Sequence, residues 1–282
     1  MVEQWAHHYP VRELCAVLEV TRSGYYAWCN GQETARAMAN RLLAEDIKRV
    51  FQANKGRYGS PRMTAHLRQE GQPCNHKRVE RLMRQHGLKG RSSRRSRVCT
   101  TDSDHDQPVA PNRLLNRAAP SRPNEIWVAD ITYVPTAQGW LFVAAVMDLY
   151  SRQILGWSVW DSLEAWGAVQ ALQRALVSRR YPRGVIHHSD RGVQYACHAY
   201  RQQLQAAGLV ASMSRRGNCY DNAAMEAFWS TLKREAMSQS PSWSKERVRR
   251  ELFEYIEGDY NQRRLHSSLG YRSPVDFENQ NS

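Results

Sequence analysis

The segment EIWVADITYVP, residues 125–135, sets the fold class because it has the period-two pattern of a β-strand. One face of that strand carries Val128, Asp130, Thr132 and Val134, and the opposite face carries Trp127, Ala129, Ile131 and Tyr133. Asp130 is therefore a charged residue in the middle of an otherwise apolar strand, and a buried carboxylate needs a partner. The strand predicts a functional site beside Asp130.

The segments after residue 125 extend this strand into a sheet. Two more strand-like stretches follow it directly, at 140–150 and 153–160, with a hairpin-like connection after Asp148. Helical and strand patterns then alternate: helices at 163–179, 195–208 and 221–237, and strands at 185–189 and 209–214. This order predicts an α/β fold, a mixed sheet with helices on both faces. A further helix is expected over 244–264.

Two more carboxylates occupy positions that suit chemistry. Asp190 ends the short apolar run GVIHHSDRG, residues 184–192, so it should project from the carboxyl end of a buried strand. Glu226 lies in DNAAMEAFWSTLKREAM, residues 221–237, whose composition favours a helix with Asn222 and Lys233 on the same face. The sequence places 35 residues between Asp190 and Glu226. We expect the three acids to meet at one edge of the sheet.

Acids gathered in one place repel each other, and bound divalent cations are the usual remedy. Carboxylate oxygens suit Mg²⁺ or Mn²⁺ best. Two such ions roughly 3.5 to 4 Å apart stabilise both the entering and the leaving oxygen of an in-line displacement at phosphorus. The pattern therefore predicts a two-ion site in which Asp130, Asp190 and Glu226 bind the metals and a phosphodiester is the substrate.

Four ordered motifs carry a family resemblance. They are WVADITY (127–133), HHSDRGVQY (187–195), DNAAMEAFWSTLK (221–233) and YNQRRLHSSLGYRSP (260–274). With these motifs the chain resembles, over about its whole length, the DDE transposases of the large bacterial insertion-sequence family that encodes two overlapping reading frames. More narrowly, it resembles the second-frame product, OrfB. Most relatives have Thr before the first Asp, where this chain has Ala129 on the opposite strand face.

The resemblance implies a ribonuclease-H-like catalytic core similar to that of retroviral integrases. It also implies a polynucleotidyl transferase that works in two stages at one site. Water first cleaves a phosphodiester at the end of the element and frees a 3'-hydroxyl, which then attacks another strand and joins the DNA. Joining one end of the element to the other would give a circular intermediate that integrates later.

Neighbouring residues have ordinary alternatives to a functional role. Asp148 fits a turn and Asp221 fits a helix N-cap. Lys233 is expected to contact a DNA phosphate, with a solvated lysine as the alternative. Asn222 either positions substrate or closes the first helical turn. His187 and His188 lie in an apolar strand and are expected to be satisfied core residues rather than ligands.

The first 90 residues are predicted to be a helical DNA-binding region. Helices are expected at 41–56, 60–71 and 76–87, and the interval GQPCN (71–75) resembles the turn of a helix-turn-helix. Residues 9–28 resemble half of another such motif. The recognition helix would be HKRVERLMRQHG, and it offers Lys77, Arg78, Arg81 and Arg84 to DNA, although a charged helix face is often simply solvated.

Residues 91–124 are polar and rich in Pro, Ser and Arg, which predicts a linker between this region and a catalytic core at 125–240. Arg94 and Arg95 could lie along a DNA backbone, or belong to a disordered tether. Residues 241–282 should form a helix and a basic tail. In that tail, Arg263, Arg264 and His266 either bind DNA or pack as a cap on the core.

Charge and composition support nucleic acid as the partner. The 282 residues carry a formal net charge of +13, which favours association with a polyanion. Long apolar runs and a secretory signal are both lacking in the sequence, so we expect no membrane and a cytoplasmic, nucleoid-associated protein. The six cysteines include no C-x-x-C pair, and no structural zinc is expected.

Two other functions remain open at this stage. A DNA-binding regulator would explain the charge but not the three acids, whereas a ribonuclease-H-like nuclease would use the acids without strand transfer. If the chain is a transposase, its partners should be the double-stranded terminal repeats, target DNA and further copies of itself as a dimer or larger assembly. The upstream-frame product, as a fusion or a separate chain, is a further expected partner.

Overall fold

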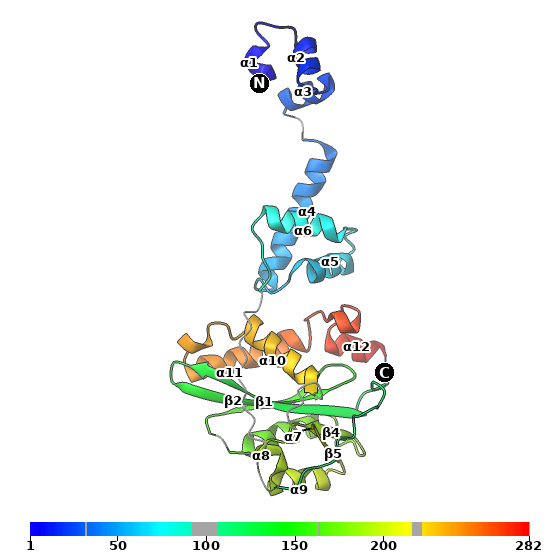
Figure 1. Cartoon of the computed structure of the whole chain (residues 1–282), viewed down its shortest axis with the longest axis vertical. Helices are drawn as coiled ribbons and strands as arrows, with labels where there is room; N and C mark the ends of the chain where they lie inside the picture. Colours follow the sequence, from blue (N-terminus) through cyan, green and yellow to red (C-terminus); the bar gives the residue numbers. More distant parts are fainter. Residues whose placement is uncertain (32, 92–106, 163, 216–221, 282) are drawn as a thin grey trace.

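The structure is a computed structural model of the full chain, and it describes residues 1–31, 33–91, 107–162, 164–215 and 222–281. Three parts follow one another along its longest axis (Figure 1): a small group of amino-terminal helices, a second helical part, and a large α/β core that also contains the carboxyl terminus. No helix in the described residues is long and apolar enough to cross a membrane.

The core is built on a five-stranded sheet with the order β3-β2-β1-β4-β5. The strands are β1 (Ile126–Thr136), β2 (Gly139–Asp148), β3 (Ile154–Trp160), β4 (Ile186–Ser189) and β5 (Val210–Met213). The first three pair antiparallel, while β4 runs parallel to β1 and β5 runs parallel to β4. The predicted mixed sheet is confirmed, and β1 is its central strand.

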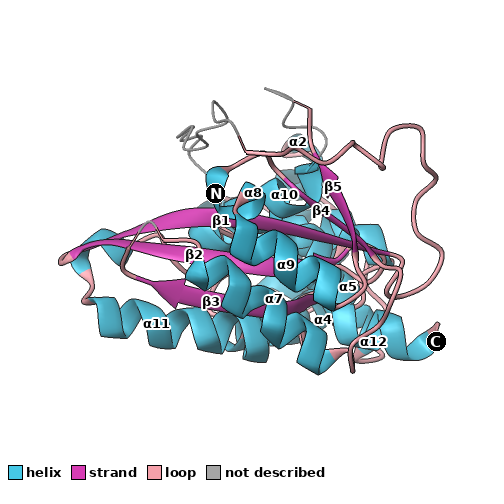
Figure 2. Ribbon diagram, turned by 90° about the horizontal axis from the view of Figure 1, so that it is seen from below, coloured by secondary structure: helices cyan, strands magenta, loops and turns pink. Residues whose placement is uncertain are grey.

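Helices cover both faces of the sheet (Figures 1 and 2). Helices α7 (Trp166–Ser178), α8 (Val193–Ala196) and α9 (His198–Ala206) pack with Trp127 and Ala129 of β1 in one hydrophobic cluster. A β-carbon on Gly156 of β3 would lie 2.3 Å from the carbonyl oxygen of Ala171, so α7 approaches the sheet as closely as a glycine permits.

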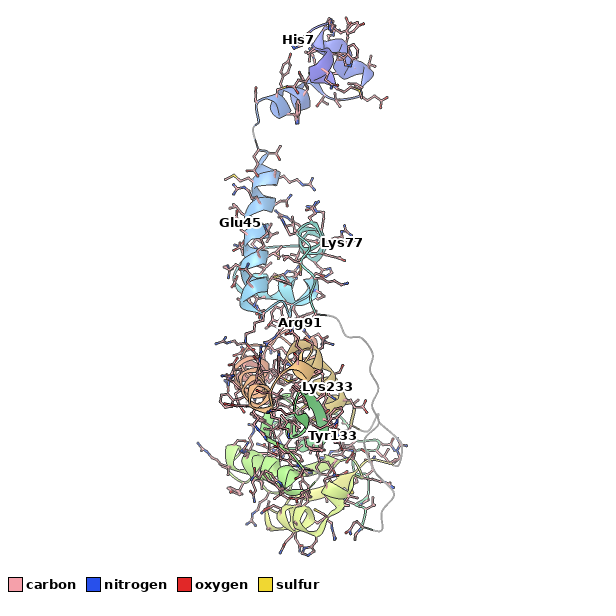
Figure 3. The ribbon with its side chains drawn as sticks, turned by 90° about the vertical axis from the view of Figure 1, so that its left-hand side faces the viewer. His7, Glu45, Lys77, Arg91, Tyr133 and Lys233 are labelled. Carbon is pink, nitrogen blue, oxygen red and sulfur yellow. The ribbon has the colours of Figure 1, made fainter. Side chains whose placement is uncertain are left out.

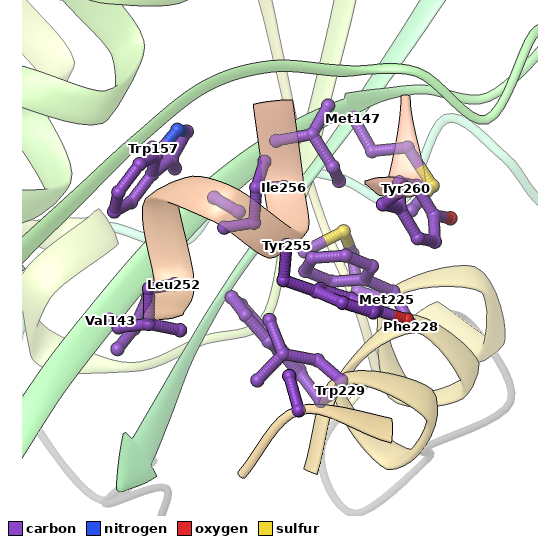
Figure 4. Close-up of a cluster of buried hydrophobic side chains, with 14 of the residues drawn as sticks. Val143, Met147, Trp157, Met225, Phe228, Trp229, Leu252, Tyr255, Ile256 and Tyr260 are labelled. Carbon is purple, nitrogen blue, oxygen red and sulfur yellow. The ribbon is translucent and has the colours of Figure 1, made fainter. Parts of the chain in front are cut away.

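The opposite face is covered by α10 (Ala223–Glu235) and α11 (Lys245–Phe253). Their side chains pack with Val128 and Val134 of β1 in a second cluster, of which Figure 4 shows the part around Phe228, Tyr255 and Ile256. The two faces of β1 thus enter different clusters, as its alternating pattern predicts. A short 3-10 turn, η2 (Ser240–Ser242), joins the two helices.

The predicted helix over 244–264 changes its winding partway. After α11 it continues as the π-helix η3 (Glu254–Tyr260), which buries Tyr255, Ile256 and Tyr260. Directly after it, the side chain of Asn261 donates to the carbonyl oxygen of Ile154 and accepts from its N–H, both at 2.9 Å. These two hydrogen bonds give the backbone N–H and carbonyl of Ile154, on the edge strand β3, their partners. They also fix the end of the helix to the sheet.

The last segments of the chain also pack on the core. The 3-10 turn η4 (Ser267–Leu269) leads to α12 (Pro274–Gln280), in which Glu278 forms an ion pair with Arg179 at the end of α7. In α12, Phe277 also contacts the ring of Tyr150, which lies just after β2. The segment expected to be a basic tail is therefore fixed to the core at its end.

The second helical part, residues 35–91, is called the helical module below. It consists of α4 (Ala35–Ala53), α5 (Ser60–Gln69) and α6 (His76–Gln85) around its own hydrophobic cluster. The first helix begins earlier than predicted because Thr34 caps it by accepting from the N–H of Ala37. Asn75 caps α6 by accepting from the N–H of Lys77, so the predicted helix, turn and helix are present.

The amino-terminal helices form a smaller unit. They are α1 (Val2–Trp5), α2 (Val11–Val17) and α3 (Arg22–Cys29), and Val2 and Cys15 are the residues that they bury. Exposed aromatic side chains such as Trp28 remain on the surface of this unit. Two buried side chains make a small core, so this part contributes little to stability.

The second half of the predicted linker follows the surface of the core. The N–H of Arg113 donates to the hydroxyl of Ser212 in β5 at 2.9 Å, and Leu114 packs against the cluster that contains β1. The N–H of Asn124 donates to the carboxylate of Asp148 at 2.8 Å. Residues 107–124 are thus part of the core surface, whereas Arg94 and Arg95 lie outside the described residues.

Candidate active site

Asp130 lies in the central strand, where its carboxylate is held in a defined orientation. Its Oδ1 accepts from the N–H of Ile131 at 2.9 Å, and its Oδ2 accepts from the indole N–H of Trp229 at 3.1 Å. Trp229 belongs to α10, so this second hydrogen bond joins the helix to the strand. The orientation of Asp130 is set from both sides.

Asp190 follows β4 directly, and the strand register brings it beside Asp130. Val128 is paired with His188 in the parallel ladder between β1 and β4, and two further residues along each strand lead to the two aspartates. The N–H of Gly192 donates to Oδ1 of Asp190 at 2.9 Å, and a β-carbon on Gly192 would lie 3.1 Å from that oxygen. A glycine at this position lets the turn fold closely around the carboxylate.

The two aspartates perturb each other electrostatically. Burial raises the pKa of Asp130 to about 8, and the negative charge of Asp190 adds to this shift. The hydrogen bonds from Ile131 and Trp229 lower the pKa, but they do not offset burial and repulsion. Glu226 raises it slightly further. The pair therefore favours either a bound proton or a bound cation at neutral pH.

Glu226 lies in the first turn of α10, and its side chain is exposed. In the described part of the chain, no three Asp, Glu, His or Cys side chains are close enough together to hold one metal ion. The structure thus brings Asp130 and Asp190 together and places Glu226 near enough to affect the pKa of Asp130, but not within one ligand cluster. The three-carboxylate metal site stays a prediction.

Asn222 has a different contact from the two that the sequence suggested. Its Nδ2 donates to the carbonyl oxygen of Ala129 at 3.1 Å, which fixes the start of α10 against β1 beside Asp130. It makes no side-chain cap bond to the helix, and its buried Oδ1 has no hydrogen-bond partner among the described residues. An unsatisfied buried oxygen is costly, and a ligand could satisfy it.

The donors around Asp130 fit a divalent cation. Two carboxylates that repel each other are the oxygen ligands that Mg²⁺ and Mn²⁺ prefer. Among the described residues, no lysine or arginine forms an ion pair with Asp130 that would take the place of such an ion. A bound ion would hence relieve the repulsion.

Lys233 lies two turns after Glu226 on α10, with an exposed side chain (Figure 3). Partial burial lowers its pKa, and the negative charge of Asp130 opposes this shift. The lysine is thus close enough to the site for its charge to interact with Asp130. Contact with DNA stays a prediction.

Trp229 is a residue of the site that the sequence did not reveal. It occurs three residues after Glu226 in an apolar helix face and contributes to the hydrophobic cluster, which is the ordinary role of a tryptophan there. The one available signal was its N–H group, since a buried indole usually finds an acceptor. That acceptor is Asp130.

The two histidines before Asp190 are satisfied core residues, as expected. His187 contacts the hydroxyl of Tyr200 at 3.1 Å, and burial lowers the pKa of His187 to about 3, so its ring is neutral. His188 lies between the hydroxyls of Ser212 and Ser214, at 2.8 and 3.1 Å. Asp148 forms the expected turn by accepting from the N–H of Tyr150 at 2.9 Å. Asp221 lies outside the described residues.

The closing motif packs as a cap instead of presenting its side chains to DNA. Arg264 is buried and donates twice to Glu235, each time at 2.9 Å. His266 is buried beside it and stacks edge-on against Tyr260, and burial lowers the pKa of His266 to about 3. The DNA-contact prediction does not hold for Arg264 and His266, because neither is accessible. Arg263 is exposed.

Helix α6 presents some of its predicted DNA-binding residues to solvent. Lys77 and Arg84 are exposed, whereas Arg78 is half-buried and donates to the side chain of Asn40 at 2.8 Å. Arg81 is also half-buried, and its Nε has no hydrogen-bond partner within the described ranges. The exposed pair is free to meet a phosphate, while Arg78 also supports α4.

Models of known protein families match most of the chain. Two models described as integrase core domains match residues 120–219 and 207–274, and a model of an HTH-like domain matches residues 38–96. Among solved structures, a simian T-cell lymphotropic virus intasome is 14% identical, with 83% of this chain and 74% of that chain covered and a TM-score of 0.48.

Close relatives cover almost the entire chain. The transposase InsF for insertion sequence IS3A of Escherichia coli (strain K12) is 40% identical over 282 residues, with 99% of this chain and 98% of its own length covered. The insertion element IS600 uncharacterized 31 kDa protein of Shigella sonnei is 41% identical over 264 residues, with 94% and 97% covered. This family implies dependence on a divalent metal and binding to DNA. The chain belongs to the transposases of the IS3 family and is an enzyme with an integrase catalytic core.

Proposed function

We propose that this transposase cleaves insertion-sequence ends and joins the freed 3'-hydroxyl to another DNA strand, using Asp130, Asp190 and Glu226 as its catalytic carboxylates. The observation that carries the proposal is the pair of adjacent aspartates in which the pKa of Asp130 is raised to about 8 by burial and by Asp190. Burial and a neighbouring carboxylate both disfavour the ionised form of Asp130, and a bound cation would favour it.

The metal would be Mg²⁺ or Mn²⁺, with two ions held by Asp130, Asp190 and Glu226. These ions would polarise the phosphodiester and stabilise the charge that develops on its oxygens. Asp130 must be deprotonated to take part, and the hydrogen bonds from Trp229 and Ile131 keep its carboxylate in one orientation. Glu226, in the first turn of α10, would be the third carboxylate to hold the ions.

The remaining polar residues at the site orient the substrate. Lys233 contacts a DNA phosphate near the reacting bond, since its charge already interacts with Asp130. Asn222 would contact the substrate through its Oδ1 atom, which has no hydrogen-bond partner in the part of the chain that the structure describes. In both stages an oxygen attacks phosphorus and the opposite phosphorus–oxygen bond breaks, first with water and then with the 3'-hydroxyl as the nucleophile.

DNA recognition is assigned to the helical module. Lys77 and Arg84 are exposed on α6, and Arg78 and Arg81 lie beside them on the same helix. We assign the terminal repeats to this helix, with Arg94, Arg95 and Arg263 as further contacts to the backbone of the duplex. The net charge of +13 supports a long contact with nucleic acid.

The assembly that acts on DNA contains at least two copies of the chain, because two element ends must be brought together. The upstream-frame product, as a fusion or as a separate chain, is its second protein partner. Both partners are inferred from the reaction that the family performs.

The test is cleavage and joining of a labelled element-end duplex in Mg²⁺ or Mn²⁺, with the natural chain and with Glu226→Gln. Glu246→Gln is the matched control, because Glu246 is an equally exposed acid in the first turn of another helix, α11. Joined product that disappears in Glu226→Gln alone supports the proposal. Metal-dependent nicking without joining would favour a nuclease, and DNA binding without either reaction would favour a regulator.

A further inference from the structure

A buried acid occupies the end of α10 opposite to Glu226. Glu235 is the last residue of that helix, and its side chain is 1% exposed. It accepts two hydrogen bonds from Arg264 and one from the hydroxyl of Tyr255, each at 2.9 Å. Burial alone would raise its pKa, but Arg264 and Arg62 outweigh this effect and hold the pKa at about 2. The acid is therefore ionised at every physiological pH.

Residues of the helical module complete the surroundings of Glu235. Arg62 of α5 donates to its carboxylate at 3.2 Å. Arg57, from the loop before α5, donates to its backbone carbonyl at 3.3 Å and forms an ion pair with Asp259. Arg91 donates to the same carbonyl at 2.7 Å, and Figure 3 shows Arg91 where the module meets the core. Three arginines of the module thus converge on the end of one core helix.

We call the contacts of Arg57, Arg62 and Arg91 with Glu235 the joint. Apolar and backbone contacts between the module and the core extend it. The hydroxyl of Tyr58 donates to the carbonyl of Arg263 at 3.2 Å and accepts from the N–H of Leu265 at 3.3 Å. Leu265 itself belongs to the hydrophobic cluster of the module, although it lies in the closing segment of the chain. Arg57 also lies over the ring of Tyr255, 5.0 Å from its centroid. The module and the core therefore share one packed interface.

The joint and the catalytic glutamate are on the same rigid element. Helix α10 runs over 13 residues without interruption, with Glu226 in its first turn and Glu235 at its end. Nine residues of α-helix span about 13 Å at about 1.5 Å per residue. A displacement of the module at Glu235 would move the helix that carries Glu226, Trp229 and Lys233.

We propose that the joint at Glu235 makes α10 a measuring arm, which fixes the distance along DNA between the base pairs held by the module and the phosphodiester that is cut. This inference rests on the proposed function. Arg57 and Arg62 are positioning residues: they contact no reacting atom and act through α10. The partner is a DNA duplex that binds to α6 and to the active site at the same time.

The alternative is that the cluster only stabilises the fold. Buried ion pairs are weak contributors to stability, because the cost of removing the charges from water offsets their attraction. What such a cluster does provide is one defined geometry, since each donor and acceptor has one correct position. A purely stabilising role would leave the position of the DNA cut unchanged when the joint is loosened.

The experiment uses the full chain and maps, at nucleotide resolution, every cut in an element-end duplex labelled on either strand. Arg57→Met and Arg62→Met, singly and combined, remove two of the three arginine contacts from the module to Glu235 and leave the contact from Arg91 and the pair between Glu235 and Arg264 in place. Arg49→Met is the matched control, because Arg49 forms an exposed ion pair with Glu70 inside the module, away from the joint. Calorimetry reports whether module and core unfold in one transition or two.

We expect the natural chain and Arg49→Met to cut at one phosphodiester, and the combined variant to cut at several neighbouring ones. Cutting at the natural position should fall about tenfold or more, since a displacement of about 1 Å can cost about a hundredfold in rate. Two unfolding transitions in the combined variant would show a loosened joint. If the combined variant cuts DNA at the same phosphodiester as the natural chain, the inference is overturned. This holds whether the variant unfolds in one transition or in two.

A natural chain that cuts no DNA refutes the proposed function itself, and the measuring role with it. A variant that fails to fold is replaced by Asp259→Asn, which removes the ion pair to Arg57 from the core side and leaves all three arginines in place. The same two readouts apply to it. Scattered cuts in either variant support the measuring arm.

Discussion

Replacing Asp130 with Asn should abolish catalysis and yet stabilise the metal-free protein at high pH. The pKa of Asp130 is raised from 3.8 to about 8 by burial and by Asp190. Between those two values the folded protein holds a proton that the unfolded chain has lost. The free energy of unfolding of the natural chain therefore falls as the pH rises from about 4 to about 8. An asparagine does not titrate, so the variant avoids this fall in the free energy of unfolding.

The magnitude follows from the size of the shift. About four pKa units at about 1.4 kcal/mol per unit give a ceiling of about 6 kcal/mol. Water that enters the site reduces this to about 3 kcal/mol, because the effective dielectric of protein sites exceeds that of a dry interior. Asparagine also turns a donor toward the indole N–H of Trp229, which costs about 1 kcal/mol. The expected net gain at pH 8 is about 2 kcal/mol.

Thermal and urea unfolding in a chelator, at pH 5 and pH 8, measure this effect. At pH 8 the melting temperature of Asp130→Asn should exceed that of the natural chain by about 5 °C, and the difference should shrink or reverse at pH 5. Asp161→Asn is the control, because Asp161 forms exposed ion pairs on the surface. Adding Mg²⁺ should stabilise the natural chain more than Asp130→Asn. A variant that is less stable than the natural chain at pH 8, or equally displaced at both pH values, would refute the reasoning.

Three further substitutions separate the roles of single contacts. Trp229→Phe keeps most of the ring packing but removes the donor to Asp130, so strand cleavage should fall about tenfold while the circular dichroism spectrum is retained. Gly192→Ala places a β-carbon 3.1 Å from Oδ1 of Asp190, so the apparent metal affinity in a titration of cleavage should weaken with little change in melting temperature. Arg264→Met leaves Glu235 buried with fewer partners, so urea unfolding should show a loss of about 3 kcal/mol. DNA affinity of the folded fraction should be unchanged, and a large loss of affinity without a loss of stability would return Arg264 to the DNA-contact role.

The alternating strand and the two aspartates were predictable because each depends on local pattern. The period of two in residues 127–134 is enough to assign the two faces of β1, and both faces enter the expected hydrophobic clusters. Asp190 is found by its position at the end of a buried strand. Parallel pairing then brings it beside Asp130, since strand pairing follows from the order of the elements.

The contacts that depend on distant parts of the chain were not predictable. Glu235 occurs in the sequence Lys-Arg-Glu-Ala at the end of a helix, which is typical of a solvated acid. It is buried because Arg62, 173 residues before it, lies across the end of α10. The packing of residues 107–124 on the core has the same origin, because tertiary contacts override weak local signals. The early start of α4 has a local cause, since Thr34 caps the helix.

Two acids that contact α10, Asp130 of β1 and Glu235 at the end of the helix, differ in their counter-charges. Glu235 is supplied with arginines from both the core and the module, and its pKa falls to about 2. Asp130 has Asp190 beside it, and in the described residues it forms no ion pair with an arginine or lysine, so its pKa rises to about 8. A chain with 40 lysines and arginines does not lack positive charge. The contrast agrees with the two proposals made for this helix, a bound cation beside Asp130 and a fixed joint at Glu235.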